Sequence, residues 1–555
     1  MKSLICALNT KYVHSSLAPW CLKAGVHEYA KNTECRVLEA TINESTDSIL
    51  EKILGCEFDI IGFCTYIWNV EKVLLLCKMV SEKRENATIV LGGPEVSYRA
   101  KDILEENPCV SLVISGEGEE PFGRLCNGEN PEEISGVSYR KDGQIVTKIE
   151  HVSKKQPPSP YTKEYFESLN GRISYIETSR GCPFSCAFCL SGRCGNVRFF
   201  DVDEAKENII KLSNSGTKTV KFVDRTFNAD KKRANEIFNF IIDNYGTKIP
   251  EGVCFHFELE GEIIDDETIF VLSKAPAGAI QVEIGLQSFN VKTLEAINRK
   301  TKIERLYSNI SKIVSLGNIH THIDLIAGLP YEDIDRFENS FNRALSLEPH
   351  MLQLGFLKLL YGSELREKSD YVYEFSENPP YEVISTPHIS REELFLLHKI
   401  EDVFERLYNS MRFPNTVKYL HSIFDNQFKM YKSLALCLEN KKNIRTLDDF
   451  TYAVYEFFSS DSRVNKAVLR DCLAKDRLST NKMGALPEFL KIHSPMLKKA
   501  LNSLEKSEDT RKSKGVKRAA TLLRSSNELI YVDYENINPV TRSYPIRTIK
   551  IEGIF

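Results

Sequence analysis

The chain has 555 residues, enough for about three or four domains, because single hydrophobic cores rarely exceed a few hundred residues. Its 42% hydrophobic and 27% charged content is that of a globular protein and excludes a collagen-like, disordered or disulfide-scaffold chain. A formal net charge of -4 excludes an overall basic surface for non-specific nucleic-acid binding, so a nucleic-acid partner is not expected unless a local basic patch supplies one.

The amino-terminal segment "MKSLICALNTKY" contains a short apolar run that a polar segment interrupts too early for a secretory signal. No stretch approaches the roughly 18 uncharged apolar residues that suggest a membrane span. We therefore expect a cytoplasmic protein without a membrane partner, whose thiols stay reduced. Cysteines that cluster in such a protein are more often metal ligands or catalytic groups than disulfide partners.

Short apolar segments alternate with helical patterns in the first 126 residues. Apolar runs separated by helices are typical of a parallel sheet that is covered on both faces. The segment "NVEKVLLLCKMVSEKRE" has apolar residues at spacings of three and four, which predicts one of the covering helices. The sequence thus predicts a doubly wound, Rossmann-like α/β domain with strands at 3–9, 35–42, 59–66, 87–93 and 111–116.

The alternation stops over residues 127–171, which are rich in turn formers and end in a proline cluster. This composition predicts a small hairpin followed by an exposed linker near 152–165.

The alternation restarts at residue 172 with a longer repeat. Its helices are expected to begin at caps such as Asp203, Asp230 and Asp265. Six units of strand and helix predict a partial (β/α)6 barrel, related to the complete barrel of eight units. The expected strands are 173–179, 219–224, 252–258, 280–286, 321–328 and 352–358.

Beyond about residue 385 the pattern changes to long helical stretches, such as "SREELFLLHKIEDVFERLYNSM". The last segment, from residue 527, has β-branched and aromatic residues that predict a terminal hairpin. The predicted organisation is therefore a doubly wound domain, a hairpin with linker, a partial barrel and a mostly helical domain. Their expected ranges are 1–135, 136–167, 168–385 and 386–555.

Three cysteines follow the first predicted barrel strand, in "YIETSRGCPFSCAFCL". Cys182, Cys186 and Cys189 are thus expected at the carboxyl end of a strand, which in barrels is the catalytic face. A structural zinc ion would need a fourth ligand, from Cys194 or a distant residue. A four-iron cluster held by the three alone would leave one iron open to a small molecule. Spacing by itself allows both sites.

The spacing CxxxCxxC, with Phe188 before the third cysteine, resembles the signature of the radical S-adenosylmethionine (SAM) superfamily. Later predicted strand ends also resemble motifs of this family. The resemblance implies that the cysteines hold a four-iron four-sulfur cluster, that SAM binds the open iron, and that a donor such as flavodoxin or ferredoxin supplies electrons. The matching strand ends are "VDRTF", "FELEGE", "EIGLQSFN", "DLIAGLPYED" and "LGFLKLLYGSELR".

Carboxylate, amide and hydroxyl groups in these motifs match the partners that the amine, ribose and adenine of SAM need. Acidic residues at strand ends can instead cap helices, which is the structural alternative for each of them. By resemblance, the expected SAM-binding residues are Phe188, Glu258, Glu283, Gln287, Ser288 and Lys358.

A doubly wound domain in front of such a barrel is similar to the cobalamin-binding class of radical SAM enzymes. The segments "GFCTYIWN", "IVLGGPEVS" and "ISGEGEEPF" carry this likeness. Open α/β sheets bind ligands at the carboxyl ends of their strands, where small residues let the backbone approach a flat corrin. The expected cobalamin-binding residues there are Thr65, Tyr66, Gly92, Gly93, Pro94, Gly116, Glu117 and Gly118.

His14 is the candidate for the histidine that binds cobalt from below in the family pattern DxHxxG. The residues that flank His14 depart from that pattern. In "KYVHSSL", Tyr12 stands at the aspartate position and Leu17 at the glycine position. His14 then lacks the usual carboxylate that orients its ring. The alternatives are that His14 binds backbone or solvent, and that the first domain serves only as a scaffold.

The resemblance implies a radical SAM enzyme that uses cobalamin for methyl transfer to an unactivated carbon. One alternative is a radical rearrangement, cyclisation or oxidation, and another is a non-catalytic zinc-binding module. The carboxyl-terminal region is similar to an uncharacterised helical extension in a bacterial subgroup of these enzymes. Neither the substrate nor a catalytic residue is predicted.

Overall fold

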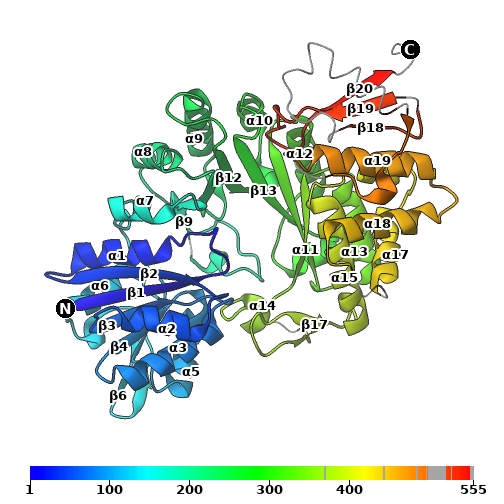
Figure 1. Ribbon diagram of the computed structural model, residues 1–555. Helices are drawn as coiled ribbons and strands as arrows, with labels where there is room; N and C mark the ends of the chain where they lie inside the picture. The colour runs from blue at the N-terminus through cyan, green and yellow to red at the C-terminus, as the bar shows by residue number, and fades with distance from the viewer. Residues whose placement is uncertain are drawn as a thin grey trace. The chain divides into compact units, whose positions relative to one another are not determined.

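The structure is a computed structural model that describes residues 1–194, 196–367, 371–439, 441, 444–482, 485–495, 497, 520–526 and 528–550 (Figure 1). The chain forms two compact units, and each is built from several segments. Unit 1 consists of residues 1–280, 295–300 and 357–386. Unit 2 consists of residues 281–294, 301–356 and 387–555.

Unit 1 begins with a seven-stranded sheet in the order β2-β1-β3-β4-β5-β6-β7. Its first five strands are parallel and confirm the strands predicted for the first domain. The predicted hairpin, β6 and β7, extends the same sheet in antiparallel fashion. The strands are β1 (Lys2–Asn9), β2 (Glu34–Thr41), β3 (Ile60–Cys64), β4 (Thr88–Gly92), β5 (Leu112–Ile114), β6 (Val137–Lys141) and β7 (Gln144–Val146).

Helices cover both faces of this sheet, as the alternating side chains of β1 require. Leu4, Cys6 and Leu8 pack into one core with α2, α3 and α5, while Ile5 and Ala7 pack into another with α1 and α6 (Figure 1). The predicted doubly wound layers are confirmed. The helices are α1 (Ala18–Tyr29), α2 (Thr46–Leu54), α3 (Val70–Lys83), α4 (Pro94–Ser97), α5 (Ala100–Glu106) and α6 (Glu119–Cys126).

The strand order has its switch point between β1 and β3, because β2 lies on one side of β1 and the later strands follow on the other. Open parallel sheets bind ligands outside the carboxyl ends of the strands at such a point. Residues after Asn9 and Cys64 therefore face the expected ligand crevice.

Unit 1 also contains the first half of the second sheet, where β8, β11 and β12 pair in parallel. Asp230 and Asp265 cap their helices as predicted. The cap at Asp203 is wrong: the Asp201 carboxylate accepts the amides of Asp203 and Glu204, so the cap lies two residues earlier. The elements are α7 (Lys163–Leu169), β8 (Ser174–Ile176), β9 (Ser179–Arg180), β10 (Arg198–Phe199), α8 (Val202–Ser213), β11 (Thr219–Phe222), α9 (Lys231–Asn244), β12 (Cys254–Leu259) and α10 (Asp266–Ser273).

Unit 2 contains the second half of that strand series, with β13, β14 and β15 paired in parallel. Along β13 the buried residues Val282 and Ile284 alternate with the partly exposed Glu283, so that one face is apolar and the other polar. The elements are β13 (Ile280–Gln287), α11 (Val291–Ala296), α12 (Ile303–Ser315), β14 (His320–Ala327), α13 (Ile334–Leu345) and β15 (Met351–Phe356).

The remainder of unit 2 is mostly helical, as predicted, and ends in an antiparallel sheet. The terminal hairpin is confirmed as β19 and β20, with β18 as a third strand. These elements are α15 (Arg391–Phe404), α16 (Pro414–His421), α17 (Gln427–Glu439), α18 (Leu447–Ser459), α19 (Lys466–Ser479), β18 (Ala520–Leu522), β19 (Glu528–Val532) and β20 (Ile546–Lys550).

Residues 357–386 return to unit 1 and form α14 (Glu364–Glu367), β16 (Glu374–Phe375) and β17 (Val383–Ser385). Within the described part of the chain, no helix combines the length and the apolar character that crossing a bilayer requires.

Candidate cofactor sites

The cysteine loop follows β9 in unit 1 and is held in place through its backbone. Cys182, Cys186 and Cys189 are free thiols of intermediate burial. Between them, the Ala187 amide donates to the Ile297 carbonyl at 2.9 Å, and the Ala187 carbonyl accepts the Leu365 amide at 3.0 Å. Two distant segments of unit 1 therefore fix the loop from either side.

The thiols of this loop have polar neighbours. Cys182 Sγ lies 3.2 Å from Thr226 Oγ1, a residue of the predicted motif "VDRTF". Burial raises the pKa of the Cys186 thiol, and the Arg299 guanidinium, whose Nη1 lies 3.8 Å from Cys186 Sγ, opposes that rise. The charges of Cys189 and Cys182 also raise this pKa.

The donor set of the loop fits a four-iron four-sulfur cluster. Three soft thiolates from one short loop are the ligands that such a cluster prefers, and three of them leave one iron open. Tetrahedral structural zinc needs a fourth protein ligand. The side chain of Cys194, the candidate for that role, lies outside the described residues.

Asp224 holds the strand that leads into the cysteine loop. Its carboxylate accepts the Thr178 amide at 3.0 Å and the hydroxyls of Thr178 and Ser179 at 2.7 and 2.5 Å. Burial raises the pKa of Asp224, while these donors oppose the rise. Asp224, the aspartate of the motif "VDRTF", is thus a structural group that positions the cysteine loop.

The SAM-binding candidates of unit 1 differ in their surroundings. Phe188 is half-buried in the cysteine loop. Glu258, at the end of β12, pairs with Arg225 at 3.8 Å and is 24% exposed. Lys358 is exposed, and its backbone bridges to Glu382. Among these, Glu258 is a partly accessible carboxylate at a strand end, as the prediction requires.

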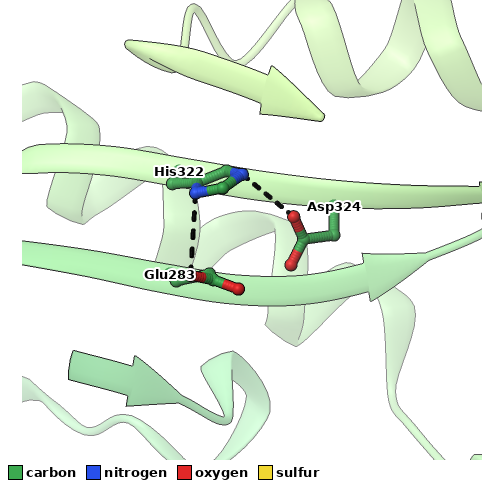
Figure 2. Close-up of side chains that lie close together, drawn as sticks. All are labelled: Glu283, His322 and Asp324. Atoms are coloured by element: carbon green, nitrogen blue, oxygen red, sulfur yellow. Dashed lines mark ion pairs between the residues drawn. The ribbon is translucent and has the colours of Figure 1, made fainter. Parts of the chain in front are cut away.

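In unit 2, Glu283 belongs to a compact group with His322 and Asp324 (Figure 2). Glu283 and His322 are register partners on β13 and β14, and Glu283 Oε2 lies 3.7 Å from His322 Nδ1. His322 Nε2 lies 3.0 Å from Asp324 Oδ1. One ligand atom from each residue falls within 4.8 Å of the others, a geometry that can bind a cation or polarise a bound polar group.

Sequence reasoning missed His322, although a signal was present. In "HTHIDLI" the polar residues His320, His322 and Asp324 alternate with Thr321 and Ile323, which are fully buried. Such alternation places the polar residues on one face of the strand. It is the register with β13 that brings His322 and Asp324 beside Glu283, and register is a long-range property.

The two other candidates of unit 2 lie at the end of β13. Gln287 has a left-handed backbone, with φ of 70°, at a bulge, and its side-chain amide covers Gly285 so closely that a Cβ there would collide with it. Ser288 is 1% exposed, and its hydroxyl accepts the Asn290 amide at 2.8 Å. The Ser288 side chain therefore stabilises the turn after the strand.

A cavity of about 650 Å³ lies inside unit 1, at the carboxyl ends of β1, β3 and β4 and of β8, β11 and β12. Its wall includes the stacked rings of Tyr66 and Trp68, 4.4 Å apart and 5° from parallel. Thr65 and Pro94 are outside the lining, and Glu258 is in it. The cobalamin candidates that line it are His14, Tyr66, Gly92, Gly93, Gly116, Glu117 and Gly118.

The His14 ring has a side-chain partner that the sequence did not suggest. His14 Nδ1 lies 2.7 Å from the hydroxyl of Tyr175, a residue of β8. This partner replaces the backbone or solvent group that the alternative interpretation expected. Burial, followed by the charge of Lys221, lowers the pKa of His14, which favours the neutral ring.

The glycines of the cavity wall serve different purposes. Gly93 and Gly116 have φ of 118° and 86°, and a Cβ would collide with the backbone oxygens of Thr65 and His151, respectively. These two are required by the protein's own packing. Gly92 has only ordinary contacts, with the nearest atom 3.7 Å from a Cβ position, and it lines the cavity. A small side chain at Gly92 would therefore meet no backbone clash, unlike one at Gly93 or Gly116.

Glu117 is engaged in an ion-pair group around Arg180, the residue two positions before Cys182. The Arg180 guanidinium lies 3.2 Å from Glu117, 2.5 Å from Glu119 and 2.8 Å from Glu177. Burial alone would raise the pKa of Glu119, but Arg180 lowers it. The group ties the first sheet to the strand before the cysteine loop.

Comparison with known proteins gives three family matches along the chain. Residues 4–126 match the family described as B12 binding domain, and residues 176–344 match the Radical SAM superfamily. Residues 369–539 match a family described as protein of unknown function (DUF4080). The first two ranges contain the cavity residues of the first sheet and the cysteine loop.

The fold and its two sites thus define a protein in which a B12-binding domain precedes a radical SAM domain. The chain therefore contains a B12-binding domain followed by a radical SAM domain, the domain order that the resemblance predicted, and a carboxyl-terminal region that matches the DUF4080 family. The radical SAM domain implies a four-iron four-sulfur cluster and SAM, and the B12-binding domain implies cobalamin.

Individual relatives agree with this class. The chain is 27% identical to a cobalamin-dependent radical SAM methyltransferase, TokK, of Streptomyces tokunonensis, over 58% of this chain and 49% of the relative. It is 27% identical to an anaerobic magnesium-protoporphyrin IX monomethyl ester cyclase of Rubrivivax gelatinosus, over 60% and 61%. The chain spans about half the length of TokK.

A solved structure of the cobalamin-dependent SAM radical enzyme OxsB, with aqua-cobalamin and SAM bound, has a similar fold. The TM-score is 0.61 at 14% identity, over 92% of this chain and 81% of that chain. The similarity extends the agreement in fold beyond the B12-binding and radical SAM domains.

Proposed function

We propose that this protein is a cobalamin-dependent radical SAM methyltransferase that acts on an unactivated carbon. The observation that carries the proposal is the cavity of unit 1. It is lined both by the strand ends of the B12-binding domain and by Glu258, at the end of a radical SAM strand. A cavity shared in this way lets a cobalamin and the radical chemistry meet at one place.

When bound, the cluster supplies the electron that cleaves SAM, SAM supplies the radical and the methyl group, and cobalamin carries that methyl group to the substrate. In the proposal, Cys182, Cys186 and Cys189 bind the cluster. His14 and Tyr66 contact the corrin, and Gly92 leaves the space for it. These assignments rest on the lining of the cavity and on the donor set of the loop.

The chain's own groups would bind and orient SAM. Glu258 and Glu283 are partly exposed carboxylates that can accept hydrogen bonds from an ammonium or from ribose hydroxyls. The Gln287 amide can both donate and accept. Phe188 and Lys358 stay in the proposal as contacts from the cysteine loop and the sixth strand end, and Ser288 as a group that shapes the turn beside Gln287.

A low-potential electron donor such as flavodoxin or ferredoxin is the partner that this chemistry requires. We also propose a cytoplasmic location, where thiols remain reduced and a cluster can be assembled. A net charge of -4 argues against non-specific nucleic-acid binding but does not distinguish a metabolite, peptide, lipid or RNA, so the substrate class stays open in this proposal.

A second candidate function is a radical rearrangement, cyclisation or oxidation. The similarity to the cyclase of Rubrivivax gelatinosus favours it, because that relative is as identical to this chain as TokK is. The two functions differ in products: methyl transfer forms S-adenosylhomocysteine together with 5′-deoxyadenosine, whereas the alternative forms 5′-deoxyadenosine without S-adenosylhomocysteine.

The test is anaerobic purification and reconstitution of the whole chain, with iron, labile sulfide, zinc and cobalt counted and SAM cleavage assayed. We expect about four irons and four sulfides, with cobalamin retained. Zinc without labile sulfide would overturn the enzyme proposal in favour of a zinc-binding module. A cluster without cobalamin retention would overturn methyl transfer and leave the radical reaction in place.

A further inference from the structure

We propose that Arg299 is a positioning residue for the cluster, which donates a hydrogen bond to the Cys186 thiolate and raises the reduction potential of the cluster. The inference rests on the proposed function, because it requires the cysteine loop to hold the cluster. It assigns a role to a residue outside the loop and outside the SAM and cobalamin candidates.

The first observation is geometric. Arg299 Nη1 lies 3.8 Å from Cys186 Sγ, within hydrogen-bond distance for sulfur, and Arg299 Nη2 lies 2.8 Å from Glu260 Oε2. The planar guanidinium thus uses two different nitrogens for two partners. Its orientation is fixed by the carboxylate, and the remaining fork nitrogen is directed at the sulfur.

The second observation is burial. The side chains of Arg299 and Glu260 are 10% and 9% exposed. Water therefore screens their charges poorly, and a cation beside a ligand sulfur acts strongly on the charge of that sulfur. The Glu260 carboxylate neutralises the Arg299 charge from Nη2, the nitrogen that does not face the sulfur. This counter-charge lowers the free-energy cost of burying the guanidinium.

The third observation is the rigidity of the arrangement. Asn228 holds the Glu260 backbone on both sides, with its amide nitrogen donating to the Glu260 carbonyl and its amide oxygen accepting the Glu260 amide. Ile297, two residues before Arg299, accepts the Ala187 amide of the cysteine loop. Hydrogen bonds to backbone groups therefore fix both the Glu260 side and the Cys186 side of the Arg299 side chain.

Reduction adds one electron to a cluster whose ligands are already negative. A positive charge and an N–H donor at a ligand sulfur stabilise the more negative, reduced state more than the oxidised state. Removal of Arg299 should therefore lower the reduction potential. Because Glu260 would then be a buried unpaired carboxylate, a double variant is the clean comparison.

The experiment is a potentiometric titration of the reconstituted whole chain, followed by electron paramagnetic resonance, with iron and sulfide counted for each sample. The variants are Arg299→Met/Glu260→Gln and Arg299→Lys. The matched control is Arg36→Met, which breaks the exposed ion pair of Arg36 with Glu34 on β2. Near-ultraviolet circular dichroism checks that each variant is folded.

At the midpoint potential of the wild type, we expect the double variant to show about a tenfold lower ratio of reduced to oxidised cluster. For a one-electron couple this is a shift of about 59 mV. Arg299→Lys should shift in the same direction by less, and Arg36→Met should match the wild type. If a folded double variant loses the cluster, Arg299→Lys decides: a lower potential than the wild type supports the inference, and an unchanged potential overturns it.

An intact cluster with an unchanged potential in the double variant overturns the inference. If the double variant does not fold, an unchanged potential in Arg299→Lys overturns it in the same way. Failure of the cluster assignment on which the inference rests is distinguishable, because the wild-type chain itself would then contain no iron and labile sulfide, whatever the variants show.

Discussion

His14 Nδ1 and the Tyr175 hydroxyl lie 2.7 Å apart, and they join the loop after β1 to the first strand of the radical SAM domain. The hydroxyl takes the place in which the DxHxxG pattern has a carboxylate. A hydrogen-bond partner at one nitrogen of a histidine ring fixes the tautomer and the orientation of the ring, and so the direction in which the other nitrogen points. In this chain the orienting group therefore comes from a different domain from the histidine.

Replacing Tyr175 by Phe should weaken cobalamin binding by about tenfold, the lower end of the effect of losing a group that orients a metal-ligating histidine. Tyr29→Phe, which lies outside the cavity lining, is the control. Equilibrium dialysis with hydroxocobalamin measures both. Equal affinities of wild type and Tyr175→Phe would show that His14 needs no orientation by this hydroxyl.

Two neighbouring glycines should respond in opposite ways. Gly92→Leu should abolish cobalamin binding and leave the fold intact, because the side chain enters the cavity without a backbone clash. Gly93→Ala should lower the free energy of unfolding by about 2 kcal/mol, because of its left-handed backbone and the Thr65 carbonyl. Cobalamin retention and chemical denaturation separate the effects. Retained cobalamin in Gly92→Leu would place the corrin elsewhere.

Replacement of any one of Cys182, Cys186 and Cys189 by Ala should remove the cluster, because each supplies one of three ligands. Cys194→Ala and Cys254→Ala should keep it, Cys254 being a buried cysteine of β12. Iron and sulfide analysis after anaerobic reconstitution gives the result. A cluster lost in Cys194→Ala would mean that a fourth cysteine closes the site.

Glu283→Gln should weaken SAM binding by about tenfold or more, the effect of losing a hydrogen bond to a charged group. His322→Asn should weaken it less, because His322 only positions the Glu283 carboxylate from β14. The exposed Glu267→Gln on α10 is the control. Isothermal titration with SAM under anaerobic conditions measures the affinities. Wild-type affinity in Glu283→Gln would assign Glu283 to a structural pair with His322.

Glu332 should make the protein less stable as the pH rises. Burial raises its pKa to about 7 from an ordinary value of 4.5, so the folded state holds a proton that the unfolded state releases between these values. The apparent free energy of unfolding should therefore fall by up to about 3 kcal/mol from pH 4.5 to 7 through this group. Glu332→Gln should remove that slope, whereas Glu304→Gln, an exposed carboxylate, should not. The measurement is chemical denaturation of the cofactor-free protein from pH 4.5 to 7. If the unfolding free energy of Glu332→Gln depends on pH as that of the wild type does, Glu332 is not the group responsible.

The strands and most helix caps were predictable because local pattern determines them. Apolar alternation located both parallel series, and Asp230 and Asp265 cap their helices as expected. Asp203 was misplaced because Asp201 and Asp203 are both good caps, and only the backbone turn selects one.

The site was predictable where a motif is continuous in sequence and not where it depends on distant contacts. The cysteine loop and the glycines of the cavity wall come from short segments. Tyr175 and His322 meet their partners through strand register and packing between domains, which no local pattern specifies. Thr65 is buried and is not among the residues that line the cavity, whereas the next residue, Tyr66, lines it.

The surroundings of the cysteine loop are made late in synthesis. Arg299 follows Cys186 by 113 residues, and the Ala187 backbone is completed on its other side by Leu365. A ribosome that has just translated the three cysteines has not yet produced either partner. A cluster inserted into a nascent chain at that stage would thus meet a loop that still lacks the Arg299 and Leu365 contacts.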